Sequence, residues 1–218
     1  MAIVNERQGP ALFVAAVFLF VMLAGSFGLA HFAFPTSSQA NMFFWDMERA
    51  AGFTAYELLA TSVLTGLAGA SGLFDKWRAR KVATETHQFL SLFFLSFLML
   101  HLWGLHEDTT IPFPWARLVV PFSSTYRPIP VGLGILAVYG LVVIIGSSLL
   151  RPHLPPKLWR GLHILSIPIF LLVTLHGILS GTDSGSHWAL PLYLIPIVLF
   201  VVLSLRRLRT RTIAPSRT

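Results

Sequence analysis

Residues 86–101 read THQFLSLFFLSFLMLH, and this stretch decides the fold. Between His87 and His101 almost every side chain is Phe, Leu or Met, so the segment suits the interior of a membrane. A histidine is costly to bury without a partner, yet one stands at each end of this apolar run, fourteen residues apart. The pattern predicts a transmembrane helix that presents an imidazole near each of its ends.

The composition of the whole chain indicates a membrane protein. The 218 residues are 55% hydrophobic and 11% charged, whereas about 25% of the residues in a soluble domain are charged. Cysteine is absent, which excludes disulfides, iron–sulfur clusters and covalently attached haem. The net charge is +7, but the basic residues lie next to apolar segments, so the charge does not indicate a nucleic-acid partner.

Six segments are long and apolar enough to cross a bilayer, which needs roughly 20 residues per helix. They are residues 10–33, 50–74, 86–106, 130–150, 159–180 and 188–206. We expect an all-α fold, a polytopic membrane helical bundle of six transmembrane helices that forms one domain over residues 10–206. A short cytoplasmic N-terminus, residues 1–9, precedes it and a basic cytoplasmic tail, residues 207–218, follows it.

The basic residues predict the orientation of this bundle. Thirteen of the sixteen lysines and arginines lie in the N-terminus, the loops at 75–81 and 151–160, and the C-terminal segment from Arg206. Cytoplasmic segments are enriched in these residues, so both termini are expected in the cytoplasm. The long opposite loop, residues 106–130, either covers one end of the bundle or is a plain connector.

A second pair of histidines, His163 and His176, bounds the stretch HILSIPIFLLVTLH. The predicted third and fifth spans run in the same direction, so His87 and His163 lie near the cytoplasmic face and the other two near the outer face. Within one helix the two histidines are about 20 Å apart. Two helices with imidazoles at matched depths can bind two b-type haems, each through two axial histidines.

Helical phase fits the first pair better than the second. Fourteen residues place His101 about 40° from His87 around the helix, whereas thirteen residues leave His176 about 140° from His163. A kink at Pro168 would change that phase. Hydrogen bonding between helices is the alternative role for these histidines.

Other pieces of sequence match a known family. They are ERAAGFTAYELL at 48–59, PFSSTYRPIPVGLG at 121–134, WRGLH at 159–163 and LHGILSGTDSG at 175–185. With the paired histidine spacings, they resemble the ferric reductase-like transmembrane domain, whose superfamily includes NADPH oxidases, ferric-chelate reductases and the bacterial haem subunit that supports methionine sulfoxide reductase.

The resemblance implies particular cofactor-binding residues. His87 and His163 would be the axial iron ligands of an inner haem b, and His101 and His176 those of an outer haem b. Arg49 would lie near the propionates of the outer haem, because arginine is a natural partner for carboxylates; the alternative is an interfacial anchor. Arg160 is placed for an inner propionate, although the excess of cytoplasmic basic residues also accounts for it.

The resemblance also implies a function. We expect a diheme b-type cytochrome of the bacterial cytoplasmic (inner) membrane, an oxidoreductase subunit that passes electrons to an outer-side redox partner. The FAD and NADPH domain of the oxidases is missing, so a separate flavoprotein or quinol would be the donor, with a flavin or quinone on the donor side. A quinol-oxidising cytochrome b and a non-catalytic membrane anchor are the alternatives. His31, His106, His153 and His187 receive no role.

Overall fold

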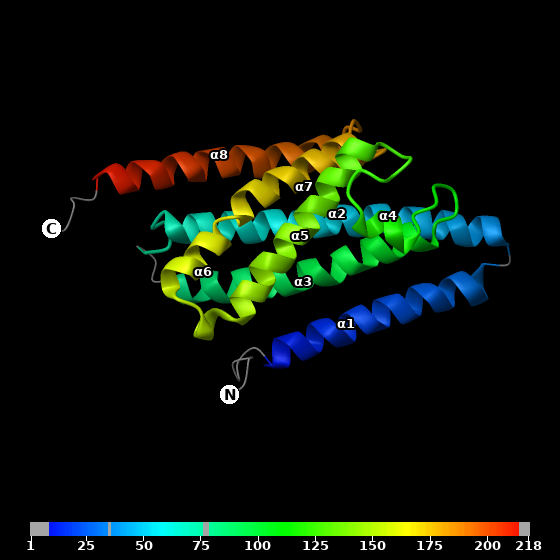
Figure 1. Cartoon of the computed structure of the whole chain (residues 1–218), viewed down its shortest axis with the longest axis horizontal. Helices are drawn as coiled ribbons and strands as arrows, with labels where there is room; N and C mark the ends of the chain where they lie inside the picture. The colour runs from blue at the N-terminus through cyan, green and yellow to red at the C-terminus, as the bar shows by residue number, and fades with distance from the viewer. Residues whose placement is uncertain (1–8, 35, 76–78, 214–218) are drawn as a thin grey trace.

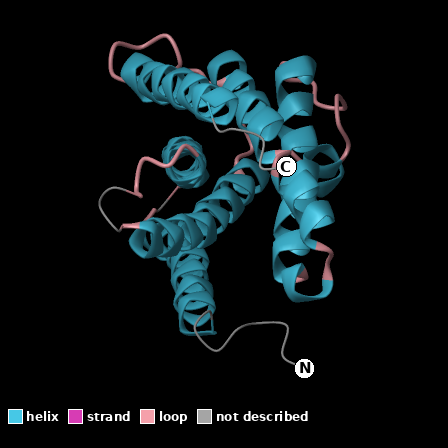
Figure 2. Cartoon of the chain, turned by 90° about the vertical axis from the view of Figure 1, so that its left-hand side faces the viewer, coloured by secondary structure: helices cyan, strands magenta, loops and turns pink. Residues whose placement is uncertain are grey.

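The structure is a computed structural model and describes residues 9–34, 36–75 and 79–213. Within these residues the regular secondary structure is entirely helical, which confirms the predicted all-α fold class (Figure 2). The helices are α1 (Gly9–Gly28) with a π-helical turn (Leu29–Ala33), α2 (Ser37–Ala70), α3 (Arg80–Glu107), α4 (Trp115–Val119), α5 (Pro128–Leu149), a 3₁₀ turn (Arg151–His153), α6 (Pro156–His163), α7 (Ser166–Ser180) and α8 (Ala189–Ile213). Nearly all of the predicted N-terminal segment 1–9, and the end of the predicted tail, lie outside the described residues.

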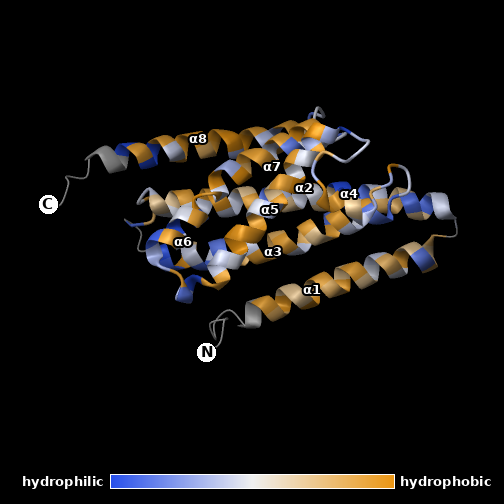
Figure 3. Cartoon of the chain, viewed as in Figure 1, coloured by the Kyte–Doolittle hydropathy of each residue, from blue (hydrophilic) through white to orange (hydrophobic). Residues whose placement is uncertain are grey.

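The described residues include five helical segments that are long and apolar enough to cross a membrane. They are Leu12–Ala33, Arg80–Glu107, Pro128–Leu149, Pro156–Ser180 and Ala189–Arg209. These correspond to five of the six predicted spans, so the multi-pass helical character of the chain is confirmed. Figure 3 shows apolar residues along the middle of the helices and hydrophilic residues gathered toward the two ends of the bundle.

The second predicted span, residues 50–74, lies in α2, which is not among these five segments. The helix begins at Ser37, thirteen residues before the predicted start, where the Thr36 side chain accepts a hydrogen bond from the Gln39 N–H. It packs against α3, α7 and α8 and carries many of the buried residues. Its buried residues lie between Phe44 and Ala68 and include small and polar side chains that pack against the neighbouring helices.

The bundle has two distinct ends (Figure 1). The start of α1, the α2–α3 connection, the α5–α6 connection and the end of α8 lie together at what we call the terminal end. The α3–α5 connection, which contains α4, and the α7–α8 connection lie at the opposite end, which we call the loop end. Helices α3 and α7 run in the same direction, from the terminal end to the loop end, as predicted for the third and fifth spans.

The chain is interrupted between α6 and α7, immediately after His163. Here the Leu165 N–H bonds to the Leu162 carbonyl and the Ile167 N–H to the Ile164 carbonyl, both at 3.1 Å and both three residues back. Pro168 cannot supply the N–H that the Ile164 carbonyl would accept in an α-helix. Tighter winding at about three residues per turn adds rotation, so this break reduces the offset of about 140° expected between the two histidines of a straight helix.

Candidate functional site

His101 of α3 and His176 of α7 line one cavity at the loop end. Residues of α2, α3, α5, α7 and the long loop at 106–130 surround this space, and most of them are apolar. Its empty volume is about 1430 Å³, a figure that includes open solvent at the mouth. The structure therefore places the predicted outer pair around one shared, mostly apolar space.

The His101 ring is fixed by α2. Its Nδ1 lies 2.8 Å from the backbone carbonyl oxygen of Glu48. A carbonyl oxygen can only accept, so Nδ1 carries the hydrogen and Nε2 keeps its lone pair. Gly52, one turn further along α2, lies against the ring, since a Cβ there would be 3.1 Å from Nδ1.

The His176 ring is held in the same way by α5. Its Nδ1 lies 2.9 Å from the carbonyl oxygen of Pro130, which is in the first turn of α5. Gly134, four residues later, faces the ring so closely that a Cβ would be 2.6 Å from Nδ1. Both imidazoles at the loop end therefore donate through Nδ1 and have Nε2 available as a metal ligand.

His87 and His163 form the second pair, at the terminal end. Their ring centroids are 5.9 Å apart, and the ring planes are inclined by 75°. The His87 Nδ1 lies 2.8 Å from the carbonyl oxygen of Ser62 and 2.9 Å from the Ser62 hydroxyl. Gly66, again four residues later on α2, lies against this ring, with a Cβ there 3.6 Å from Cε1.

His163 differs from the other three histidines. Its Nδ1 is buried, and among the described residues it has no hydrogen-bond partner. The ring stacks on Trp159, with centroids 5.1 Å apart and planes inclined by 23°, and the Arg151 guanidinium lies 4.4 Å from the Trp159 ring centroid. This imidazole is held by ring stacking on the surface side and by contact with His87 on the other.

The space between the two pairs is filled by aromatic side chains. Phe94 lies midway between His87 and His101 along α3 and is buried. Tyr56 of α2 stacks on Phe170 of α7, with centroids 6.2 Å apart, and Phe170 is fully buried. Buried aromatic side chains therefore lie between the two pairs.

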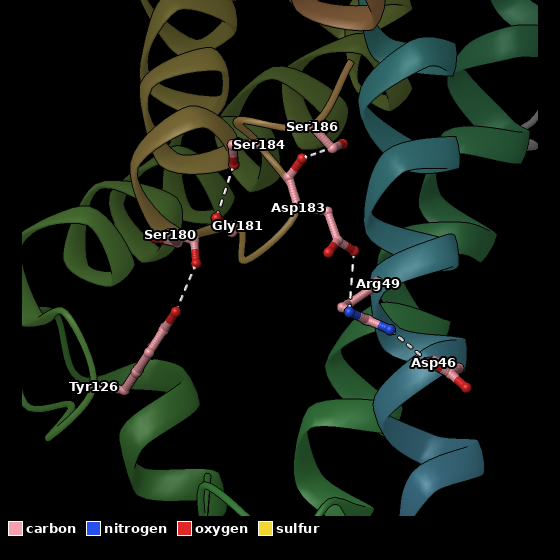
Figure 4. A network of polar contacts seen from close by, with 8 residues as sticks. All are labelled: Asp46, Arg49, Tyr126, Ser180, Gly181, Asp183, Ser184 and Ser186. Atoms are coloured by element: carbon pink, nitrogen blue, oxygen red, sulfur yellow. Dashed lines mark hydrogen bonds and ion pairs between the residues drawn. The ribbon is translucent and has the colours of Figure 1, made fainter. Parts of the chain in front are cut away.

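Arg49 lines the same loop-end cavity as His101 and His176, and its role as a propionate partner stays a prediction. Its guanidinium pairs with Asp183 at 3.0 Å and with Asp46 at 2.5 Å, as Figure 4 shows. It also lies 5.2 Å from the Trp45 ring centroid, and its Nε is buried without a partner in the described part of the chain. The arginine is thus held in place by two carboxylates.

Arg160 has a different environment. Its side chain is exposed on α6 at the terminal end, and the described residues provide it with no ion pair. Its role as a propionate partner stays a prediction, and its position equally fits a basic residue at a membrane surface.

The long loop at 106–130 closes the side of the loop-end cavity, where Ile111, Phe113 and Leu118 line it. Tyr126 donates a hydrogen bond to the Ser180 carbonyl at 3.0 Å (Figure 4). Arg127 donates to the Leu179 carbonyl at 2.6 Å. These bonds tie the loop to the end of α7, one turn beyond His176. The loop is a wall of the site and not a plain connector.

The remaining histidines lie outside the two pairs. His31, His153 and His187 are exposed. His106 lies 3.2 Å through Nδ1 from the Phe113 carbonyl oxygen and stacks on Trp115, with centroids 4.2 Å apart. His106 therefore holds the loop against the end of α3.

Reasoning from the sequence missed the glycines and carbonyls that orient the rings. A signal was present, because Gly52 and Gly66 are fourteen residues apart on the second span, the same spacing as His87 and His101 on the third. Comparison of the chain with protein-family models, with curated proteins and with solved structures gives no match.

Proposed function

We propose that the chain is a diheme b-type cytochrome that carries electrons across a bacterial inner membrane. The observation that carries this proposal is the repeated arrangement of His87, His101 and His176. Each donates through Nδ1 to a helix carbonyl and lies against a glycine four residues further on, which leaves Nε2 as the coordinating atom. Fixing the tautomer through a second hydrogen bond is typical of metal-ligating histidines.

The donor set favours haem over a metal ion held by the protein alone. Among the described residues, no group of three or more His, Asp or Glu side chains could hold a metal ion. Two facing imidazoles leave most of a metal's coordination positions to another ligand, and a porphyrin fills four of them. Centroids 5.9 Å apart bring His87 and His163 close enough to bind one ion between them, with bonds of about 2 Å.

Each part of the chain has a role in this proposal. Haem, when bound, would supply reversible one-electron redox chemistry with both axial positions filled. His87 and His163 would hold it at the terminal end, and His101 and His176 at the loop end. Phe94, Tyr56 and Phe170 keep water out of the layer between them, which lowers the local dielectric.

The proposed topology has six spans, with α2 as the sixth, and places the terminal end in the cytoplasm. The excess of lysines and arginines at that end supports this orientation. Electrons would enter there from a separate flavoprotein or quinol and leave at the loop end to an outer redox partner. The resemblance of the histidine spacings to the ferric reductase-like transmembrane domain supports the same direction.

Haem analysis of the purified protein tests the proposal. After expression with ample haem, we expect a Soret band, low-spin six-coordinate spectra and two non-covalent haems per chain. His101→Ala and His87→Ala should each remove mainly one haem, whereas His153→Ala, on an exposed histidine, should leave both in place. A chain that folds and shows no Soret band would contradict the proposal.

A further inference from the structure

A side-chain hydroxyl lies beside the Nδ1 of His87, in addition to the backbone carbonyl. The carbonyl and the hydroxyl of Ser62 are 2.8 and 2.9 Å from this nitrogen. The carbonyl can only accept a hydrogen bond, whereas the hydroxyl can accept one or donate one. If the hydroxyl donated to Nδ1, the ring hydrogen would lie on Nε2, which could then not coordinate a metal. The direction of this one bond therefore decides whether His87 can be a ligand.

A second serine, Ser91 of α3, determines that direction. Its hydroxyl donates to the carbonyl of His87, one turn back on the same helix, at 2.8 Å. The same hydroxyl lies 2.9 Å from the hydroxyl of Ser62. A hydroxyl has one hydrogen to donate, and Ser91 uses its hydrogen on the carbonyl. At the contact between the two hydroxyls, Ser62 is therefore the donor and Ser91 the acceptor.

The same count places the hydrogen of the His87 ring. Because the hydrogen of the Ser62 hydroxyl is directed at Ser91, this hydroxyl accepts at its contact with Nδ1. Nδ1 therefore carries the ring hydrogen and Nε2 keeps its lone pair. The bonds run in one direction around a closed ring, from Nδ1 to Ser62, to Ser91 and back to the His87 carbonyl. Ser62 is 4% exposed, so its hydroxyl depends on these protein partners.

The four paired histidines differ in the residue four positions further along the chain. It is Ser91 after His87, Leu105 after His101, Ile167 after His163 and Ser180 after His176. The Ser180 hydroxyl is 3.4 Å from Nδ1 of its histidine, beyond the usual range of such bonds. His163, which faces His87, has a buried Nδ1 with no partner among the described residues. At the terminal end, one ring is therefore bonded to a carbonyl and a hydroxyl, and the ring that it faces to neither.

We propose that Ser91 is a positioning residue that keeps His87 in its ligating tautomer and makes it the stronger axial ligand of the terminal-end haem. The inference rests on the proposed haem function and deepens it. Without Ser91, the hydrogen of the Ser62 hydroxyl has two acceptors left, the His87 carbonyl at 3.4 Å and Nδ1 at 2.9 Å. The hydroxyl then competes for Nδ1 with the tautomer that binds iron. With Ser91 in place, both groups of Ser62 accept from Nδ1 and increase the basicity of Nε2.

Substitution of Ser91 in the full chain tests the proposal. Ser91→Ala should weaken haem binding at the terminal end by about 10- to 100-fold, the usual effect of losing a partner of a metal ligand. It should also raise the midpoint potential of that haem, because a less basic ligand stabilises ferric iron less. Ser91→Thr keeps a hydroxyl that can bond to the carbonyl four residues back, so it should restore both values. Haem transfer to excess apomyoglobin and redox titration measure the two effects, and the loop-end haem should not change.

The double variant Ser62→Ala/Ser91→Ala distinguishes control of the tautomer from a general loss of packing. Ser62→Ala removes the hydroxyl that would compete for Nδ1 and leaves the carbonyl as the acceptor, as at His101. It should therefore be milder than Ser91→Ala, and the double variant should be no worse than Ser62→Ala alone. If Ser91→Ala has the same effect with and without the Ser62 hydroxyl, or no effect in either background, the proposal is wrong.

Thr54→Ala is the matched control. The Thr54 hydroxyl also donates to the carbonyl four residues back, at 2.8 Å, and Thr54 is not among the residues that line the loop-end cavity. Both haems should keep their affinity and potential in this variant, and a change as large as that of Ser91→Ala would contradict the proposal. All these outcomes leave the haem function standing, whereas a folded wild-type chain without haem would remove the proposed function itself.

Discussion

At the scale of single residues, the site depends on how a buried imidazole satisfies its polar atoms. His101 and His176 have their Nδ1 atoms within 2.8 and 2.9 Å of carbonyl oxygens. Each carbonyl belongs to a helix and has a second lone pair to offer. The cost of burying one ring nitrogen is therefore removed by the backbone, and the other nitrogen is left for a ligand.

The three glycines that face the imidazole rings differ in how much room a side chain would have, so alanine substitutions there should differ in their effect. A Cβ would lie 2.6 Å from the ring at Gly134, 3.1 Å at Gly52 and 3.6 Å at Gly66. Alanine should therefore be most harmful at Gly134, at about 1–3 kcal/mol of overpacking, milder at Gly52 and close to neutral at Gly66. Haem content per chain and thermal unfolding in detergent measure this order.

Gly25→Ala is the control for that series, because it adds a methyl group in open space. It should stabilise α1 by roughly 0.5–1 kcal/mol, since glycine is a poor helix residue. Equal haem content in all three ring-facing variants would show that the glycines do not seat the imidazoles.

At the scale of elements, the break between α6 and α7 sets the direction in which His163 points. Pro168 has no N–H for the Ile164 carbonyl, which accepts from Ile167 instead. Pro168→Ala should allow a continuous α-helix and rotate His163 away from His87. We expect loss of the terminal-end haem with the loop-end haem retained, as measured by haem content and redox titration.

Helix α8 provides the control for this substitution. Pro196 also lies inside a helix, but α8 carries none of the four paired histidines, so Pro196→Ala should keep two haems per chain. A Pro168→Ala protein with both haems intact would mean that the break is not needed for ligation.

The long loop at 106–130 is attached to α7 by two hydrogen bonds, one from Tyr126 and one from Arg127. Removing one of them should lower the free energy of unfolding by a measurable amount. Tyr126→Phe keeps the ring and removes the bond to the Ser180 carbonyl. We expect a loss of about 1 kcal/mol in unfolding free energy and a perturbed spectrum of the loop-end haem. Ile129→Val, at an exposed neighbouring position with no side-chain hydrogen bond to lose, should change stability by no more than about 0.5 kcal/mol.

At the scale of the whole molecule, the open point is whether α2 crosses the membrane as the sixth span. The chain has no cysteine, so single cysteines report sidedness without background. Ser38→Cys and Ser123→Cys lie on exposed positions at the loop end, and Asp75→Cys and Lys157→Cys on exposed positions at the terminal end.

With an impermeant maleimide on intact spheroplasts, we expect the two loop-end cysteines to react at once. The two terminal-end cysteines should react only after the membrane is opened, because that end carries most of the lysines and arginines and the proposed topology places it in the cytoplasm. Labelling of Ser38→Cys and Asp75→Cys from the same side would show that α2 does not cross.

The sequence by itself determined the features that follow from hydrophobicity and spacing. Apolar length predicted six spans, five of which correspond to helices that are long and apolar enough to cross a membrane. The matched spacings predicted that His87 would meet His163 and that His101 and His176 would share a space. These features depend on local periodicity and on the thickness of a bilayer, both of which can be read along one chain.

Only the tertiary structure decided the rest. The early start of α2 and its central position depend on neighbours that replace lipid, so hydropathy gave little sign of them. A break after His163 takes the place of the expected kink at Pro168. It forms because Pro168 has no N–H and because the residues before it make hydrogen bonds three residues back. Contacts between helices that are distant in sequence determine which carbonyl orients each imidazole and which glycine lies against its ring. These contacts therefore decide which ring nitrogen remains free to bind a metal.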